Sequence, residues 1–325
     1  MTSPFSGFEV EEADRPKAAG FAFDLDRTLS SVLALEAEVP KDAFTASVLG
    51  TERVGNGVVV REDGVVLTIG YLVTEAEQVT LTAGDGRRVP AHVLGVDSAS
   101  GFGLVHALEP LGLPAVSIGD SRSLTNDSVL LIAGGGGRAH AAQGVLTNRE
   151  PFAGYWEYLL DDALFTAPAH PHWSGAAVIG PKGDLVGLGS LRVEQQGAKG
   201  RASALNMSVP AERLASVFED LLRGRASGTP RPWLGLFAQA LDDKLVVLGV
   251  SPGGPAAKAE LRRGDIILSL ANKPLDDLAA FYRALWALGP AGVEVPLTLA
   301  REGDVFDVRV RSADRNALLK KRRLN

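Results

Sequence analysis

The residues best suited to chemistry lie in one polar loop, which reads His-Pro-His-Trp-Ser-Gly over residues 170–175. Ser174 precedes an apolar run at residues 176–179, and a second apolar run at 185–191 follows the turn Pro-Lys-Gly-Asp. This pattern predicts a β-hairpin with a serine at its start. A serine hydroxyl becomes a nucleophile only when a base takes its proton, and the five histidines are the usual candidates at neutral pH.

This loop resembles the nucleophile loop of trypsin-like serine proteases, in particular of the HtrA (DegP-like) family, where the serine lies in Gly-Asn-Ser-Gly-Gly-Pro. Ser174 and Gly175 match that motif, whereas His172 and Trp173 replace Gly-Asn. The resemblance covers residues 24–222 and implies that Ser174 is the retained position of the nucleophile.

The same resemblance implies that the other two members of the catalytic triad are lost. The family reads Leu-Thr-Asn-Asn-His-Val-Val, whereas residues 67–73 read Leu-Thr-Ile-Gly-Tyr-Leu-Val, so Tyr71 occupies the histidine position. The family's Asp-Leu-Ala-Val-Leu becomes Gly-Phe-Gly-Leu-Val, so Gly101 occupies the aspartate position. A phenol keeps its proton at pH 7, and losing one triad member costs about 10⁴ or more in turnover. We therefore expect a catalytically degenerate pseudoprotease.

Two histidines close to Ser174 leave an alternative open. His172 or His170 could act as a rearranged base, which would give an active serine endopeptidase. The side chain of His172 is, however, expected on the oxyanion-hole side of the loop. That hole requires backbone N–H groups near residues 172 and 174, and a residue other than glycine at 172 disfavours the necessary conformation.

The elements around these positions read as short β-strands. Asp-Gly and Gly turns separate apolar runs at residues 54–60, 65–68, 79–82, 87–94, 102–108, 129–132, 142–147 and 155–160. Such spacing predicts a barrel or a sandwich, and a long helix with one apolar face is expected after residues 208–210. The fold class is mainly β, and the resemblance implies a trypsin-like double β-barrel over residues 24–222, after a flexible leader at residues 1–23.

The remaining chain resembles a PDZ domain of the HtrA type. A linker at residues 223–231 precedes the PDZ domain (α+β) at residues 232–312, whose series Pro-Ala-x-x-Ala-x-Leu-x-x-Gly-Asp-Ile-Ile is specific. A basic tail at residues 313–325 follows.

The PDZ resemblance implies a binding site for polypeptides or protein C-termini. The backbone N–H groups of Leu234, Gly235 and Leu236 would receive the C-terminal carboxylate of a peptide. Leu278 and Tyr282, on an amphipathic helix at residues 276–288, would line the pocket for its side chain.

Composition and charge exclude several classes of function. A net charge of −6 and a pI near 5.5 argue against nucleic-acid binding. The chain has no cysteine, no ligands at metal-site spacing and no sign of a cofactor. We expect no membrane span, and an acidic N-terminus without a signal-peptide core predicts a cytoplasmic protein. The family resemblance implies a homotrimer joined through Phe21 and Phe23.

A phosphatase is a third class of function. Residues 21–29 resemble the first motif of haloacid-dehalogenase-like phosphatases, with Asp24 as nucleophile, and residues 118–121 resemble a later metal-binding motif. That chemistry needs a lysine between the motifs, but residues 42–181 contain none. Asp24 and Asp26 more simply begin a short amphipathic helix.

Overall fold

The structure, a computed structural model, describes residues 7, 9–196, 202–225, 227–242, 244–275 and 277–320. Parts of the predicted leader and basic tail lie outside these residues. The chain divides into two compact units. Unit 1 comprises Met1–Glu150, Asp162–Ala226 and Lys320–Asn325, and unit 2 comprises Pro151–Asp161 and Ser227–Leu319.

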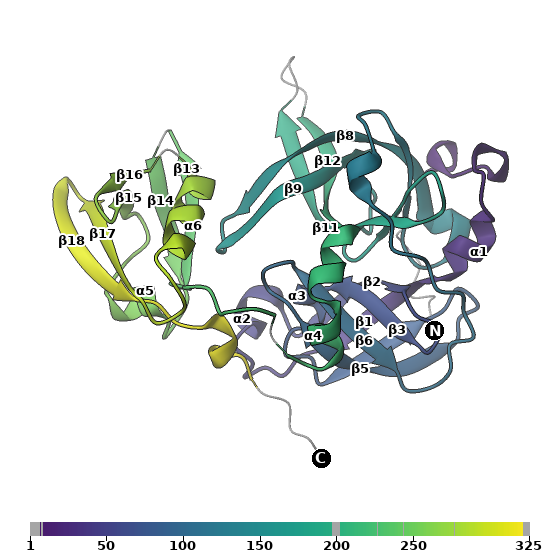
Figure 1. The fold of residues 1–325 in the computed structure, drawn as a ribbon, viewed down its shortest axis with the longest axis horizontal. Coiled ribbons are helices and arrows are strands. Elements are labelled where there is room, and N and C mark those ends of the chain that lie inside the picture. The colour runs from purple at the N-terminus through teal and green to yellow at the C-terminus, as the bar shows by residue number, and fades with distance from the viewer. Residues whose placement is uncertain are drawn as a thin grey trace. The chain divides into compact units, whose positions relative to one another are not determined.

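The first half of unit 1 is a closed six-stranded barrel in the order β1-β2-β3-β6-β5-β4 (Figure 1). Leu33, Leu35, Leu67 and Leu104 are fully buried, and most of the residues beside them in β1, β3 and β6 are buried as well. Its strands are β1 (Val32–Glu38), β2 (Glu52–Val59), β3 (Val65–Ile69), β4 (Gln78–Thr82), β5 (Arg88–Val96) and β6 (Phe102–Ala107).

The second half of unit 1 is another closed barrel, in the order β10-β11-β12-β9-β8-β7. Leu130, Leu146, Leu164 and Val178 form part of its core. Its strands are β7 (Val129–Ala133), β8 (Ala141–Gly154), β9 (Tyr158–Ala167), β10 (Ala177–Ile179), β11 (Leu185–Gln196) and β12 (Ala202–Pro210). The hairpin predicted after Ser174 is β10 and β11, and the trypsin-like double barrel is confirmed.

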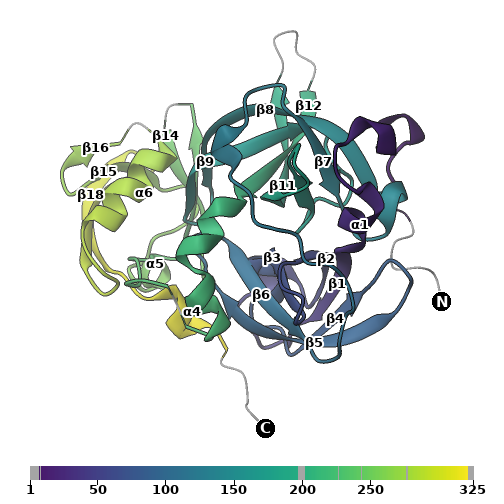
Figure 2. The ribbon, with the colours of Figure 1, turned by 45° about the vertical axis from the view of Figure 1, so that its right-hand side comes forward.

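The helices of unit 1 are short. They are α1 (Leu25–Ser30), α2 (Ala46–Leu49), α3 (Gly70–Val73) and α4 (Phe218–Leu222), with 3₁₀ turns η1 (Glu12–Asp14), η2 (Ala18–Gly20), η3 (Ser121–Ser123), η4 (Gly137–His140) and η5 (Ala211–Ser216). The prediction of a long helix after residue 210 is wrong. The segment forms η5 and α4, which are separated by Val217 with a non-helical φ of −123°. The α4 helix packs on β5 and β6 (Figure 2).

Unit 2 contains the PDZ fold, with strands in the order β13-β14-β15-β17-β18 and β16 beside β15. Val247, Ile267, Phe281 and Leu297 belong to its buried core, and Asp277 caps α6 by accepting a hydrogen bond from Ala280 N at 2.6 Å. The elements are β13 (Leu236–Leu241), β14 (Lys244–Val250), α5 (Pro255–Lys258), β15 (Ile266–Leu270), β16 (Lys273–Pro274), α6 (Leu278–Ala287), β17 (Glu294–Arg301), β18 (Asp304–Arg311) and η6 (Arg315–Leu318).

Candidate functional site

Ser174 lies in the loop between β9 and β10, and its hydroxyl contacts Tyr71. Tyr71 belongs to α3, which follows β3 directly, and its Oη atom lies 2.7 Å from Ser174 Oγ. The Tyr71 hydroxyl also donates a hydrogen bond to the carbonyl oxygen of Ser190 at 2.7 Å. A phenol has one proton and a carbonyl can only accept, so Ser174 must be the donor to Tyr71. The chain of donors therefore runs from Ser174 through Tyr71 to Ser190.

The hydroxyl that contacts Ser174 is a weak acid in a buried position. Burial raises the pKa of Tyr71 to about 12, although the contact with Ser174 acts in the opposite direction. The phenol is therefore protonated at neutral pH, and its oxygen accepts the serine proton in a hydrogen bond without removing it. Tyr71 and Ser174 are thus joined by a hydrogen bond between two hydroxyl groups.

Gly101 lies in a tight turn next to α3. Gly101 N donates to Asp97 O at 2.8 Å, and Gly70 N donates to Gly101 O at 2.6 Å. The φ of Gly101 is +86°, a region that residues with a side chain rarely adopt. Asp97, in the same turn, accepts a hydrogen bond from Ser100 N at 2.7 Å through its Oδ2 atom.

The two histidines proposed as alternative bases contact each other. His170 Nε2 lies 2.9 Å from the carbonyl oxygen of His140, and His170 Nδ1 accepts from His172 N at 3.1 Å. Because a carbonyl accepts, the Nε2 atom carries the proton, and both ring nitrogens of His170 are in use. Burial lowers the pKa of His170, and burial followed by the proximity of His170 lowers the pKa of His172 to about 4. Both rings are therefore neutral at pH 7.

The contact between His170 and His172 also affects the expected oxyanion hole. The hole would need the amides of residues 172 and 174, but the amide of His172 donates to its neighbour's ring. That donor is therefore directed to a structural partner and not to a substrate carbonyl.

Asn56 fixes the serine loop, and the sequence interpretation missed this role. Its Nδ2 atom donates to His172 O at 3.0 Å and to Ser174 O at 2.9 Å, and its Oδ1 atom accepts from Gly135 N at 2.9 Å. The Asn56 side chain is fully buried. A polar residue between two glycines inside an apolar strand was the only sequence signal for it.

The residues predicted to bind a peptide carboxylate meet in unit 2. Leu234, Gly235 and Leu236 direct their amides at the carboxyl group of Glu157, and Leu278 and Tyr282 are buried in α6. Glu157 was missed as a site residue, because no local pattern relates it to residues 234–236.

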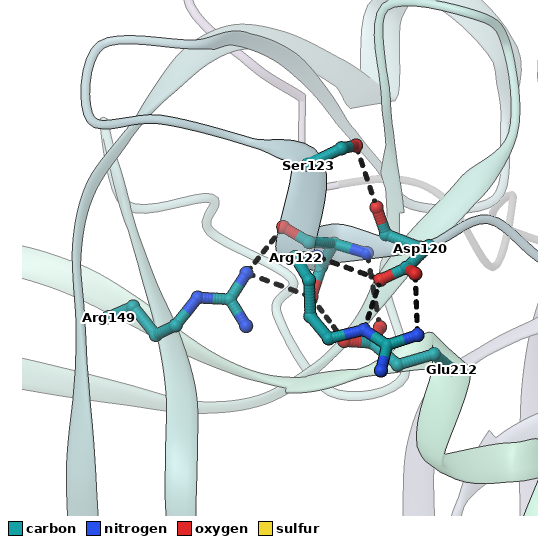
Figure 3. A network of polar contacts seen from close by, with 6 residues as sticks. Asp120, Arg122, Ser123, Arg149 and Glu212 are labelled. Carbon is teal, nitrogen blue, oxygen red and sulfur yellow. Dashed lines mark hydrogen bonds and ion pairs between the residues drawn. The ribbon is translucent and has the colours of Figure 1, made fainter.

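The acidic residues of the phosphatase alternative are engaged separately. Asp24 caps α1, and Asp26 forms an ion pair with Arg138 at 2.6 Å. Figure 3 shows Asp120 with Arg122, whose hydrogen bonds lower the pKa of Asp120 to about 2. Arg149 and Glu212 complete that network through Ser121. Throughout the described residues, no group of three acidic, histidine or cysteine side chains could hold a metal ion.

Two protein families match the chain. Residues 55–188 match the trypsin-like peptidase domain, and residues 232–311 match the PDZ domain. No helix in the described part of the chain is both long and apolar enough to cross a membrane.

Curated relatives match most of the chain. The chain is 29% identical over 277 residues to the probable periplasmic serine endoprotease DegP-like of Pseudomonas fulva, covering 80% of this chain and 55% of the relative. It is 25% identical over 275 residues to the periplasmic serine endoprotease DegP of Salmonella typhimurium, covering 79% and 56%. The chain thus spans about half the length of these relatives.

Solved structures show the same fold. The HtrA-type protease AlgW with decapeptide has a TM-score of 0.53 at 20% identity, covering 90% of this chain and 97% of that chain. The serine endoprotease from Yersinia pestis has a TM-score of 0.51 at 22% identity, covering 90% and 98%.

The names of the relatives correct one prediction. A cytoplasmic location was expected, but these relatives are named periplasmic proteases, so that expectation is wrong. It depended on the composition of a short N-terminal segment, whereas the compartment follows from targeting signals that are separate from the folded domains. The chain therefore carries a trypsin-like peptidase domain followed by a PDZ domain, and it is similar to HtrA/DegP-like serine proteases.

Proposed function

We propose that this protein is a catalytically inactive member of the HtrA type that binds polypeptides through its PDZ domain. The observation that carries the proposal is the hydrogen bond between Tyr71 and Ser174, at 2.7 Å. The position of the general base holds a protonated phenol, and that phenol donates its own hydrogen bond to the Ser190 carbonyl.

The expected loss of activity is large. Removing the base of a serine protease triad lowers turnover by roughly 10⁶, and losing one oxyanion-hole donor lowers it by roughly another 10²–10³. Tyr71 accounts for the first loss, and the His172 amide bonded to His170 accounts for the second. Gly101 supplies no carboxylate that could orient a base at position 71.

Peptide binding is supported by the converging amides of Leu234, Gly235 and Leu236. These groups already receive one carboxyl group, that of Glu157, so their geometry suits a carboxylate. We propose residues 24–222 as the trypsin-like domain, residues 223–231 as the linker and residues 232–312 as the PDZ domain. A periplasmic location follows the names of the relatives, and a homotrimer through Phe21 and Phe23 stays a prediction.

A paired assay tests the proposal. Fluorescent casein is incubated with the wild-type protein and with Ser174→Ala, while binding of unfolded casein is measured by co-sedimentation. We expect no cleavage by either protein and equal binding by both. Cleavage by wild type that disappears in Ser174→Ala would refute the inactive state, and His172→Ala and His170→Ala would then identify the base.

A further inference from the structure

The carboxyl group of Glu157 lies where a carboxylate ligand of a PDZ domain is expected. Its Oε1 atom accepts from Gly235 N at 2.6 Å and from Leu236 N at 2.8 Å. Its Oε2 atom accepts from Leu234 N at 3.0 Å. Gly235 has a φ of +76°, and this left-handed conformation lets successive N–H groups converge on one anion. Glu157 is only 9% exposed, so the amides hold a buried carboxyl group.

The residues before Glu157 also follow the course of a bound peptide. Ala238 N, two residues after Leu236 on β13, donates to the carbonyl oxygen of Tyr155 at 3.0 Å. Alternate amides of β13 therefore bind Glu157 and Tyr155, as an edge strand binds an added strand. The strand order leaves β13 at the end of the sheet, which is where such a strand is added.

The α6 helix holds the opposite side of the same segment. The hydroxyl of Tyr282 donates to Gly154 O at 2.7 Å and accepts from Glu157 N at 3.1 Å. Arg283 forms an ion pair with Asp161, at the far end of the segment. Residues 154–157 thus lie between β13 and α6, the two elements that form a PDZ groove.

Glu157 differs from a peptide terminus in one respect. Its φ of +61° turns the chain back into β9, so a side-chain carboxyl group stands in for a C-terminal carboxylate. The chain continues through this position, and the ligand is therefore part of the protein itself.

We propose that residues 151–161 are an internal ligand of the PDZ groove, and that an external peptide with a free C-terminal carboxylate binds by displacing Glu157 from the amides of Leu234, Gly235 and Leu236. This inference rests on the proposed function, because it assumes that the groove binds peptides. Because the segment belongs to the same chain, its effective concentration at the groove is on the order of millimolar. The apparent affinity for an external peptide is the intrinsic affinity multiplied by the fraction of grooves that the segment leaves free.

The test uses the full chain and a set of variants. Glu157→Ala removes the internal carboxyl group, and Glu157→Gln keeps its shape without its charge. Tyr282→Phe removes the hydrogen bonds to Gly154 and Glu157 and leaves the amides untouched. Glu150→Ala changes an exposed glutamate of the same hairpin and is the matched control.

Two readouts separate the inference from the proposed function. Hydrogen exchange at the amides of residues 234–236 reports the internal ligand, and fluorescence anisotropy reports binding of decapeptides with an apolar C-terminal residue. We expect Glu157→Ala to increase exchange and to tighten peptide binding by about 10–100-fold, with smaller effects for Glu157→Gln and Tyr282→Phe. Glu150→Ala should match wild type in both readouts. Peptides with an amidated C-terminus should bind Glu157→Ala no more tightly than they bind wild type.

Each outcome then has one meaning. Equal exchange at residues 234–236 in wild type and Glu157→Ala would overturn the internal ligand, as would equal peptide affinity in the two proteins. Faster exchange in Glu157→Ala without peptide binding by any protein would confirm that Glu157 occupies the groove, but it would overturn displacement by peptides and the proposed function together.

Discussion

Replacing Asn56 should destabilise unit 1 strongly, because this one side chain joins two loops of the second barrel to the first barrel. Asn56 lies in β2, and it contacts the carbonyls of His172 and Ser174 and the amide of Gly135. Asn56→Ala leaves His172 O and Gly135 N without these partners. Ser174 O keeps its bond from the Asn56 backbone N–H at 2.8 Å.

The size of the effect follows from those two groups. A buried polar group that loses its partner costs about 1–3 kcal/mol, so two of them give about 2–6 kcal/mol. Water entering the vacated space can restore part of this loss, and we expect about 3 kcal/mol. Asn56→Asp keeps the volume but sets a carboxylate against the carbonyl oxygens of His172 and Ser174, so it should lose at least as much at pH 7.

Urea unfolding measures this loss of stability. Circular dichroism gives the midpoints, and hydrogen exchange assigns the affected transition to the barrels. Gln78→Ala, an exposed change in β4 of the first barrel, is the control and should stay within about 0.5 kcal/mol of wild type. If both Asn56 variants also stayed within about 0.5 kcal/mol, the role assigned to Asn56 in fixing the serine loop would be refuted.

Three further predictions concern the remaining parts of the account. Tyr71→His alone should not restore casein cleavage, because Gly101 supplies no carboxylate and the loss of that orienting group lowers turnover by about 10⁴. Cleavage near the rate of an active trypsin-like protease would contradict this prediction. Burial raises the pKa of Glu157 to about 7, whereas the amides of residues 234–236 and Arg315 act in the opposite direction, and Tyr282 is the neighbouring titratable group. Because ionisation of the buried carboxyl group is unfavourable, a rise in pH through 7 should weaken the binding of Glu157 to those amides. Protection of those amides, corrected for intrinsic exchange, should fall by up to about 10²-fold from pH 4.5 to 8 in wild type but not in Glu157→Gln. Asp265→Ala should destabilise unit 2 by about 2 kcal/mol, because it removes a buried acceptor of two Arg301 hydrogen bonds; unchanged urea unfolding would exclude this.

The sequence sufficed for the architecture because its signals there are local. Short apolar runs separated by Asp-Gly and Gly turns predicted the barrel strands, and the resemblance to the HtrA family pointed to Ser174, Tyr71 and Gly101. The structure brings these three positions together, since Tyr71 contacts Ser174 and Gly70 donates to Gly101.

The parts that the sequence did not reveal depend on contacts between distant residues. Glu157 and Gly235 are far apart in the chain, and a glutamate beside aromatic residues carries no sign of its partner. The bond from the His172 amide to the His170 ring depends on how the loop folds, which residue types alone do not determine. The break at Val217 was missed because the apolar face continues across it.

The most direct test of the account is the reaction of Ser174 with a fluorophosphonate probe, followed by intact mass spectrometry of wild type and Ser174→Ala. An activated serine is modified because a base takes its proton, whereas the Ser174 proton is held by the Tyr71 hydroxyl. We predict no added mass in either protein after prolonged incubation, with an active trypsin-like protease as the positive control. Stoichiometric labelling of wild type that is absent from Ser174→Ala would contradict the central claim that this site is catalytically inactive.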